Sequence, residues 1–335
     1  MTPEIPRAFD LEKEVFAVSN EKQFDLIALR VFEFQFYQNS LYNQYCKLLN
    51  KTPETITSTN QIPFLPISFF KSNQVVTTSF EPELIFESSG TSGVNTSRHY
   101  IKNATIYRNS FRRAFNHFFG KVENYCVLGL LPSYLERGNS SLVYMVDQLI
   151  RDSKHPESGF YLYDYEKLHE VILKIESTAI PTILFGVTYA LLDLSKQYPN
   201  KLNHVKIIET GGMKGRQKEM VKSELYDILK KAFCLDHIYS EYGMTELLSQ
   251  AYAHDGMYTC PPWMKIVLRD ETDPLSNSEN GRITSGAINV IDLANLYSCS
   301  FIATDDIGKI HSNGSFEVLG RLDNSDIRGC SLMVL

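Results

Sequence analysis

The spacing of apolar and polar positions changes repeatedly between residues 21 and 254. Short continuous apolar runs, typical of buried strands, alternate with longer segments in which apolar residues recur with the spacing of a helix. The predicted strands are residues 127–131, 182–187, 205–210 and 237–240, and the predicted helices are residues 21–50, 103–118, 139–151, 165–177, 189–197 and 215–232. This alternation predicts an α/β fold built on a substantial parallel or mixed sheet.

The pattern becomes rich in strands after about residue 255. Helical periodicity fades there, and short strands are predicted at residues 264–270, 282–291, 298–304, 308–311 and 315–319. We therefore expect two parts. The first is an α/β core with a helical N-terminal region over residues 1–255, and the second is a smaller β-rich subdomain over residues 256–335.

Composition narrows the class of protein. The chain has 335 residues, of which 43% are hydrophobic and 21% are charged, so it can form a sizeable core. A net charge of −6 without a block of basic residues disfavours nucleic acid as a partner. We find neither a signal-peptide pattern nor an apolar run near the roughly 18 to 20 residues of a membrane span. These features predict a cytoplasmic protein.

The cysteines and histidines do not indicate a metal site by their spacing. The six cysteines are widely spread, without a Cys-x-x-Cys pair or a nearby histidine. This disfavours a zinc site and a disulfide scaffold, and it suits a reducing compartment. Four histidines have no partner at a spacing that would indicate a catalytic role: His99, His117, His237 and His254. We interpret them as ordinary loop or partly buried residues.

A loop of glycines and hydroxyl residues follows a short apolar run at residues 84–86. Its residues are Ser88, Ser89, Gly90, Thr91, Ser92 and Gly93. Glycines let the backbone approach an anion closely, and hydroxyls with free amides bind phosphate oxygens. It is not a Walker loop, because no Gly-Lys-Ser/Thr follows. The loop is a candidate phosphate site, and the alternative interpretation is a flexible surface turn.

A second candidate segment runs from Tyr242 to Glu246. Tyr242 offers a flat face to a base, Gly243 follows it, Thr245 offers a hydroxyl, and Glu246 offers a carboxylate for Mg²⁺. The alternative is a strand-to-helix turn with capping residues. Upstream, a predicted strand ends in the glycine pair Gly211 and Gly212. Ligands approach open α/β sheets at such strand ends, and the alternative is a helix-entry turn.

Two further candidates lie near the C-terminus. Asp306 can accept hydrogen bonds from two ribose hydroxyls, since one carboxylate has room for both. Its alternative is a β-turn acid, and Asp305 competes with it for the role. Arg321 can reach phosphates or ribose as a cationic fork, and its alternative is a surface ion pair.

In their order along the chain, these motifs resemble those of the adenylate-forming enzymes, which include acyl-CoA synthetases, firefly-type luciferases and peptide-synthetase adenylation domains. The chain looks most similar to the LuxE-type acyl-protein synthetases, and phenylacetate-CoA ligases are a more distant likeness. The supporting segments are Pro63-Phe64-Leu65-Pro66, Phe69-Phe70-Lys71, Ser88 to Gly93, Gly320-Arg321 and Arg328-Gly329-Cys330.

The resemblance implies a role for each matching residue. The Ser88–Gly93 loop would hold the phosphates of ATP, and Gly211 and Gly212 would line the adenine. Tyr242, with Gly243 and Thr245 beside it, would stack on the adenine. The catalytic Glu246 would bind Mg²⁺. Asp306 would bind the ribose, Arg321 would contact the nucleotide as a catalytic cation, and Asp323 falls where larger relatives place their hinge.

The same resemblance implies a reaction. A fatty acid would be activated by ATP as an acyl-adenylate and passed to the thiol of Cys330, then to an acyl reductase. A thiolate is a good nucleophile, and Arg328 would lower the pKa of Cys330. The alternative for Cys330 is a buried apolar residue in a final strand.

The chain departs from the larger relatives at three places. The phosphate loop is followed by Thr96 and Arg98 rather than by a lysine, and Tyr134 stands where many relatives have an aromatic-His pair. We expect the usual C-terminal lid of larger relatives, with its lysine, to be missing, because too few residues follow Gly329. Two alternatives stay open: a phenylacetate-type acyl- or aryl-CoA ligase, and a non-catalytic nucleotide-binding subunit of an acyl-transfer complex.

Overall fold

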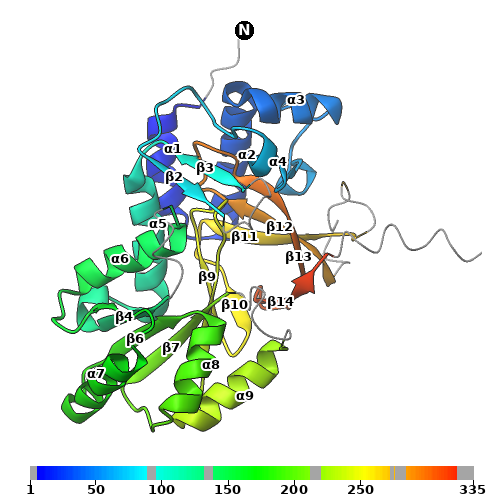
Figure 1. The fold of residues 1–335 in the computed structure, drawn as a ribbon. Helices are drawn as coiled ribbons and strands as arrows, with labels where there is room; N and C mark the ends of the chain where they lie inside the picture. Colours follow the sequence, from blue (N-terminus) through cyan, green and yellow to red (C-terminus); the bar gives the residue numbers. More distant parts are fainter. Residues whose placement is uncertain are drawn as a thin grey trace, which may run out of the picture.

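The computed structural model describes residues 6–88, 96–131, 139–211, 220–271, 275 and 284–322. Within these ranges, one large sheet of twelve strands runs through the molecule (Figure 1). Its strands are β1 Leu65–Pro66, β4 Cys126–Leu130, β5 Gly159–Phe160, β6 Thr182–Gly186, β7 Val205–Thr210, β8 Tyr239–Tyr242, β9 Ala251–His254, β10 Met257–Thr259, β11 Met264–Arg269, β12 Ser285–Asp292, β13 Phe301–Ile310 and β14 Phe316–Arg321. A separate hairpin pairs β2, Leu84–Glu87, with β3, Arg98–Ile101.

The large sheet changes from parallel to antiparallel pairing at β8, which we call the seam strand. On one side of it, β7, β6, β4 and β5 follow in order with parallel pairing. On the other side, β9, β10, β14, β13, β12 and β11 follow with antiparallel pairing. All residues of β4 and β6 are buried, as their continuous apolar sequence predicts for strands covered on both faces.

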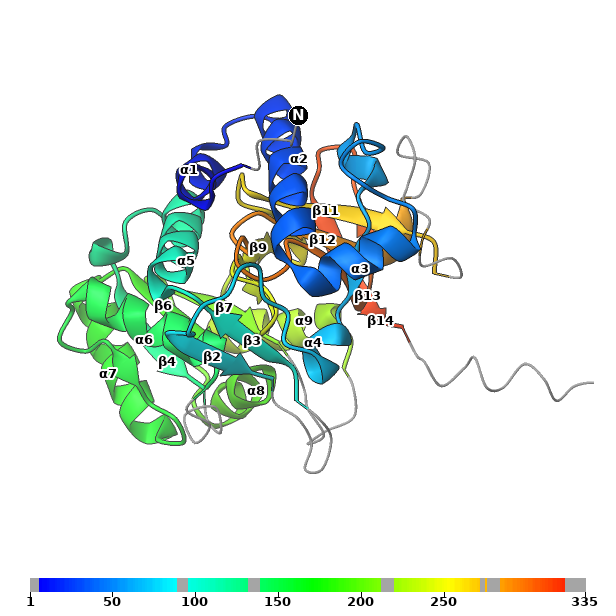
Figure 2. The ribbon, with the colours of Figure 1, turned by 90° about the horizontal axis from the view of Figure 1, so that it is seen from above.

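The helices lie at both ends of this sheet. They are α1 Ala8–Glu14, α2 Glu21–Gln38, α3 Ser40–Leu48, α4 Phe69–Ser72, α5 Ala104–Phe119, α6 Ser141–Ser153, α7 Tyr165–Thr178, α8 Thr188–Gln197 and α9 Lys222–Phe233. Helices α7, α8 and α9 lie by the parallel strands (Figure 1), and α2 lies alongside β11 and β12 (Figure 2). No helix among the described residues has both the length and the apolar character that a bilayer crossing needs.

The predicted single helix over residues 21–50 is wrong in one respect. It divides at Asn39, which ends α2 and whose side chain accepts a hydrogen bond from the backbone N–H of Tyr42 at 3.0 Å. The amide nitrogen of the same side chain, Nδ2, donates to the carbonyl of Ser298 at 2.9 Å. Asn39 therefore caps the new helix and ties it to a distant loop, which favours a break over continued helix.

The strands on both sides of residue 255 belong to the same sheet. Asp255 itself lies in the tight turn between β9 and β10, and β10 pairs in turn with β14. The mixed α/β architecture agrees with the predicted fold class. The division into a core over residues 1–255 and a subdomain over residues 256–335 stays a prediction.

A buried carboxylate anchors the end of β12. Asp292 accepts hydrogen bonds from the backbone N–H groups of Leu248, Ser249 and Ala294 at 2.9, 2.8 and 3.0 Å, and from the Ser249 hydroxyl at 2.6 Å. Burial raises the pKa of Asp292 to about 6 in spite of these donors, so the group is mostly ionised at pH 7. The chain segment after β8 is thereby fixed to β12.

We expect Asp292→Ala to destabilise the fold strongly, by about 3 kcal/mol or more, because it leaves several buried donors without a partner. Urea denaturation at pH 7 measures the change in the free energy of unfolding. Asp236→Ala, at an exposed position, is the matched control and should change stability by less than about 0.5 kcal/mol. Equal stability of the two variants would contradict this view of Asp292.

Candidate functional site

The Tyr242–Glu246 motif begins at Tyr242, the last residue of β8, and continues into a segment with neither helix nor strand structure. Its backbone is held by side chains from elsewhere in the chain. Asn295 donates from Nδ2 to the carbonyl oxygen of Glu246 at 2.7 Å and accepts from the backbone N–H of Leu248 at 2.9 Å. Together with Asp292, this contact fixes the position from which the Glu246 side chain extends.

His99 connects the β2–β3 hairpin to the same segment. The ring is buried, its Nδ1 lies 2.9 Å from the carbonyl oxygen of Thr245, and its Nε2 lies 2.8 Å from the Ser298 hydroxyl. Burial lowers the pKa of His99 to about 4, although the contact with Thr245 opposes the shift. The neutral ring therefore donates from Nδ1 and accepts at Nε2. The interpretation of His99 as an ordinary loop or partly buried residue is wrong.

The hairpin that His99 belongs to carries the first candidate loop. Ser88 and Ser97 face each other where this loop joins β2 and β3: the backbone N–H of Ser88 donates to the Ser97 carbonyl at 3.0 Å, and the Ser88 hydroxyl accepts from the Ser97 N–H at 3.0 Å. The structure thus brings Ser88 into the region of the Tyr242–Glu246 motif. The remaining loop candidates lie outside the described residues: Ser89, Gly90, Thr91, Ser92 and Gly93.

Tyr242, Asp306 and Arg321 form one chain of contacts from the seam strand β8 to β13 and β14. The Tyr242 hydroxyl donates to Asp306 Oδ2 at 2.9 Å, and Arg321 Nε lies 3.4 Å from Asp306 Oδ1. Asp306 and Arg321 are opposite each other in the β13–β14 register. Burial raises the pKa of Asp306, against the hydrogen bond from Tyr242 and the positive charge of Arg321. The neighbouring Asp305 is exposed, so the structure distinguishes the two acids.

Glu246 is a buried carboxylate in a positive field. Burial raises its pKa, and the positive charges of Lys71 and Arg321 act in the opposite direction. Lys71 lies in the short helix α4, which follows β1, and β1 is paired with β13. A carboxylate oxygen fits Mg²⁺, and two cations beside it fit the phosphates that such an ion accompanies. Sequence reasoning did not identify Lys71 as a site residue, because its role depends on this pairing.

The carboxyl end of β7 forms the next part of the site. Gly211 follows β7 with a φ of +48°, in the left-handed region that favours glycine. The hydroxyl of the preceding Thr210 is buried and has no hydrogen-bond partner among the described residues. A Cβ at Gly243, after β8, would lie 2.3 Å from Glu241 Oε1, so a larger residue there would force the Glu241 side chain to move. Gly212, Asp323 and Cys330 lie outside the described residues.

Glu241 is a second functional candidate that sequence reasoning missed. It is opposite Thr210 in β7 and Tyr252 in β9, so the three side chains share one face of the sheet. Burial and the negative charge of Glu209 raise the pKa of Glu241 to about 8, although Lys222 opposes the shift. Glu241 is therefore largely protonated at neutral pH and can donate a hydrogen bond.

Unpaired polar atoms lie close to Glu241. The buried Thr210 Oγ1, Gln250 Oε1 and Tyr252 hydroxyl have no hydrogen-bond partner among the described residues. Buried polar groups are normally paired, so such a group of atoms at the carboxyl ends of β7 and β8 is typical of a ligand site. By contrast Glu209, the residue before Thr210, accepts hydrogen bonds from the hydroxyls of Thr188 and Ser240.

Solved structures with the same architecture define the class of the fold. An open conformation of 2-hydroxyisobutyryl-CoA ligase, in complex with 2-HIB-AMP and CoA, matches 96% of this chain and 80% of its own length, with a TM-score of 0.63 and 11% identity. ATP-bound MatB from Rhodopseudomonas palustris matches 72% of this chain with a TM-score of 0.53 and 17% identity. This chain spans only 49% of MatB. The fold is that of the adenylate-forming ligases, as the sequence predicts.

Sequence comparison gives the family. The family model described as acyl-protein synthetase, LuxE, matches residues 8–335, and the chain therefore belongs to the LuxE family. The long-chain-fatty-acid–luciferin-component ligase of Vibrio harveyi is 23% identical over 340 residues, which cover 90% of this chain and 84% of that protein. The predicted family and the predicted enzyme class, an ATP-dependent ligase, are confirmed.

We expect the ionisation of Glu241 to destabilise the fold as the pH rises. Its folded pKa of about 8 exceeds the ordinary value of 4.5, so the stabilisation is complete below pH 4.5 and is lost as the pH rises through 8. Glu241→Gln imitates the protonated form and avoids this loss.

Urea denaturation at pH 5 and pH 8.5 tests the expectation. The free energy of unfolding of the variant, relative to that of the parent protein, should be higher at pH 8.5 than at pH 5 by about 2 kcal/mol or more. Glu224→Gln, at an exposed position of α9, is the control and should show no such gain. A constant difference between Glu241→Gln and the parent would contradict the raised pKa.

Proposed function

We propose that this chain activates a long-chain fatty acid with ATP as an acyl-adenylate and transfers the acyl group to a protein cysteine thiol. The observation that carries the proposal is the convergence of Tyr242, Asp306, Arg321 and Glu246 at the carboxyl end of β8. Membership in the LuxE family supports the acyl-protein synthetase reaction.

The nucleotide end of this site would be formed by the chain of contacts Tyr242–Asp306–Arg321. Asp306 is held by Tyr242 and retains lone pairs that can accept from ribose hydroxyls. The Arg321 side chain is 85% exposed, so its guanidinium can turn from Asp306 toward a bound nucleotide. Tyr242, Gly211, Gly212, Gly243 and Thr245 would border the base.

The phosphate end would be formed by the loop at Ser88–Gly93 and by Glu246. When bound, Mg²⁺ neutralises phosphate charge, and Glu246 is the residue that would hold it. Lys71 and Arg321 would add positive charge where pyrophosphate leaves. We propose Lys71 as a cation that contributes to adenylation in this chain.

The proposed reaction has two steps. In the first, a carboxylate oxygen of the fatty acid attacks the α-phosphorus of ATP, and the bond from that phosphorus to the pyrophosphate oxygen breaks. In the second, a thiolate attacks the acyl carbon, AMP leaves with the electron pair of the mixed anhydride, and a thioester forms. We propose Cys330 as the acceptor, on the basis of the resemblance described above.

We propose that the acyl group then passes to an acyl reductase. The name of the Vibrio harveyi relative, a luciferin-component ligase, supports a partner that consumes the acyl group. The competing acceptor is coenzyme A, since the chain shares its fold with CoA ligases. The two acceptors are distinguished by the second experiment below.

The first experiment measures fatty-acid-dependent exchange of pyrophosphate into ATP. We expect Asp306→Ala to raise KM for ATP by about 10- to 100-fold, because a charged hydrogen-bond acceptor for the ribose is lost. Glu246→Gln should mainly lower kcat, since the metal contact acts on the leaving phosphates.

The neighbouring acid provides the matched control for this experiment. Asp305→Ala, next to Asp306 but exposed, should leave KM for ATP within about threefold. Thermal melting confirms that each variant is folded. Equal effects of Asp305→Ala and Asp306→Ala would contradict the proposed nucleotide site, and absence of exchange in the parent protein would contradict the proposed adenylation of this acid.

The second experiment follows covalent acylation by intact mass. With ATP, Mg²⁺ and tetradecanoic acid, we expect a hydroxylamine-sensitive acyl adduct on the parent protein and on Cys234→Ser, a control at an exposed free cysteine. Cys330→Ser should lose the adduct and retain pyrophosphate exchange. An adduct that persists in Cys330→Ser, or acyl-CoA formation unaffected by that substitution, would contradict Cys330 as the acceptor.

A further inference from the structure

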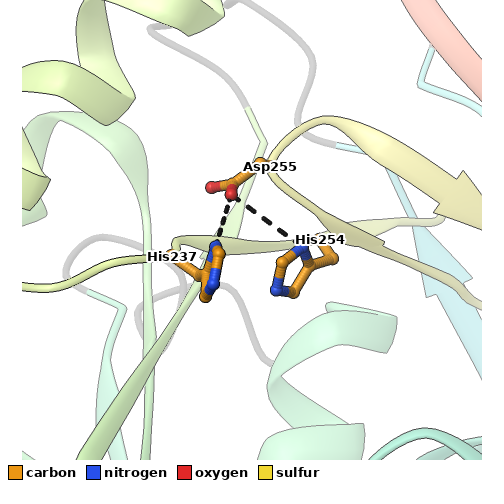
Figure 3. Close-up of side chains that lie close together, drawn as sticks. All are labelled: His237, His254 and Asp255. Carbon is orange, nitrogen blue, oxygen red and sulfur yellow. Dashed lines mark hydrogen bonds and ion pairs between the residues drawn. The ribbon is translucent and has the colours of Figure 1, made fainter.

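We propose that His237, His254 and Asp255 form a binding site for a divalent transition metal, with Zn²⁺ as the ion that fits best. Figure 3 shows both imidazole rings directed to the same carboxylate. Within the part of the chain that the structure describes, one potential ligand atom from each of these residues lies within 4.8 Å of the others. The site is independent of the function proposed above.

The distances suit a tetrahedral ion. His237 Nδ1 lies 2.7 Å from Asp255 Oδ2, and His254 Nδ1 lies 3.8 Å from the same oxygen. Ligand atoms around tetrahedral Zn²⁺ lie roughly 3.3 to 3.5 Å apart, given metal–ligand bonds of about 2.0 to 2.2 Å. The two observed distances bracket this value, so small side-chain rotations would make room for the ion.

The backbone around Asp255 is tightly constrained. Asp255 and Gly256 have φ values of +51° and +86°, the conformation of a two-residue hairpin turn between β9 and β10. The backbone N–H of Asp255 also donates to the carbonyl of Ile238 at 3.0 Å. His254 pairs with Tyr239 in the β8–β9 register, and His237 lies two residues before β8, so hydrogen-bonded strands and their turn hold the three ligands near one another.

A second set of contacts orients the carboxylate. Asp255 Oδ1 accepts from Lys230 Nζ at 2.9 Å and from the backbone N–H of Ile238 at 3.1 Å. The other oxygen, Oδ2, is the one that faces the imidazoles. Metal ligands in proteins are commonly oriented in this way by contacts behind them. Lys230 therefore holds the far oxygen and does not occupy the position of the ion.

The chemistry of the donors selects the ion. Two imidazole nitrogens and one carboxylate oxygen suit Zn²⁺ and its first-row neighbours, whereas Mg²⁺ and Ca²⁺ prefer oxygen ligands alone. His237 and His254 are both exposed, so water can complete the coordination. The site lies at the opposite end of β8 from Tyr242, away from the candidate nucleotide site.

The test uses full-length protein without a histidine tag, treated with a chelator and then dialysed. We expect excess ZnCl₂ to raise Tm by about 3 °C, since binding to the folded state alone stabilises it. MgCl₂ should not produce this rise. The double variant His237→Ala, His254→Ala should lose the response, whereas His117→Ala, at an exposed histidine of α5, should retain it.

Co²⁺ absorption provides a readout that does not depend on stability. The parent protein and Cys234→Ser should give the same visible spectrum of four-coordinate Co²⁺, and the double histidine variant should give none. A Zn²⁺ response that persists in the double variant would overturn the proposal. So would the absence of both a Tm rise and a Co²⁺ spectrum in the parent protein.

Discussion

The candidate site depends on hydrogen-bond partners for the backbone of a largely buried segment that forms neither helix nor strand. Residues 243–250 follow the seam strand β8 without forming helix or strand, and their N–H and C=O groups cannot pair along a regular ladder. Side chains pair with several of them instead: His99, Asn295 and Asp292. Because unpaired buried backbone groups are costly, these side chains determine where the motif residues lie.

This arrangement also sets the electrostatics of the site. Three carboxyl groups, those of Glu241, Glu246 and Asp306, have pKa values raised by burial. Exposed cations act on two of these groups from the solvent side: Lys71 and Arg321 on Glu246, and Arg321 on Asp306. An anionic nucleotide would therefore meet positive charge first, and the acids lie behind it.

The sequence predicts the regular parts of this structure well. The sequence predicts strands β4 and β6 because their apolar runs are nearly continuous, and this reflects burial on both faces. The break at Asn39 was missed, because apolar residues continue on both sides and the capping contact is invisible in the local pattern. Tertiary contacts with a loop near Ser298 decide that boundary.

The candidate site was only partly predictable, for a related reason. Its motifs could be located along the chain, but the choice between Asp305 and Asp306 required the contact with Tyr242. His99, Asp292 and Lys71 act on residues far away in sequence, so no spacing marks them. The His237–His254–Asp255 cluster was missed likewise, since the β8–β9 register creates it.

The dependence of residues 243–250 on distant side chains limits how the motif can be moved. A short segment that carries Tyr242 to Glu246 would not keep its shape if grafted onto another scaffold, because His99, Asp292 and Asn295 would stay behind. Recombination between homologous chains should therefore succeed only at crossover points that keep β3, the β8 segment and the end of β12 from the same parent. The motif is short in sequence, but the parts that must come from the same parent extend from residue 98 to residue 295.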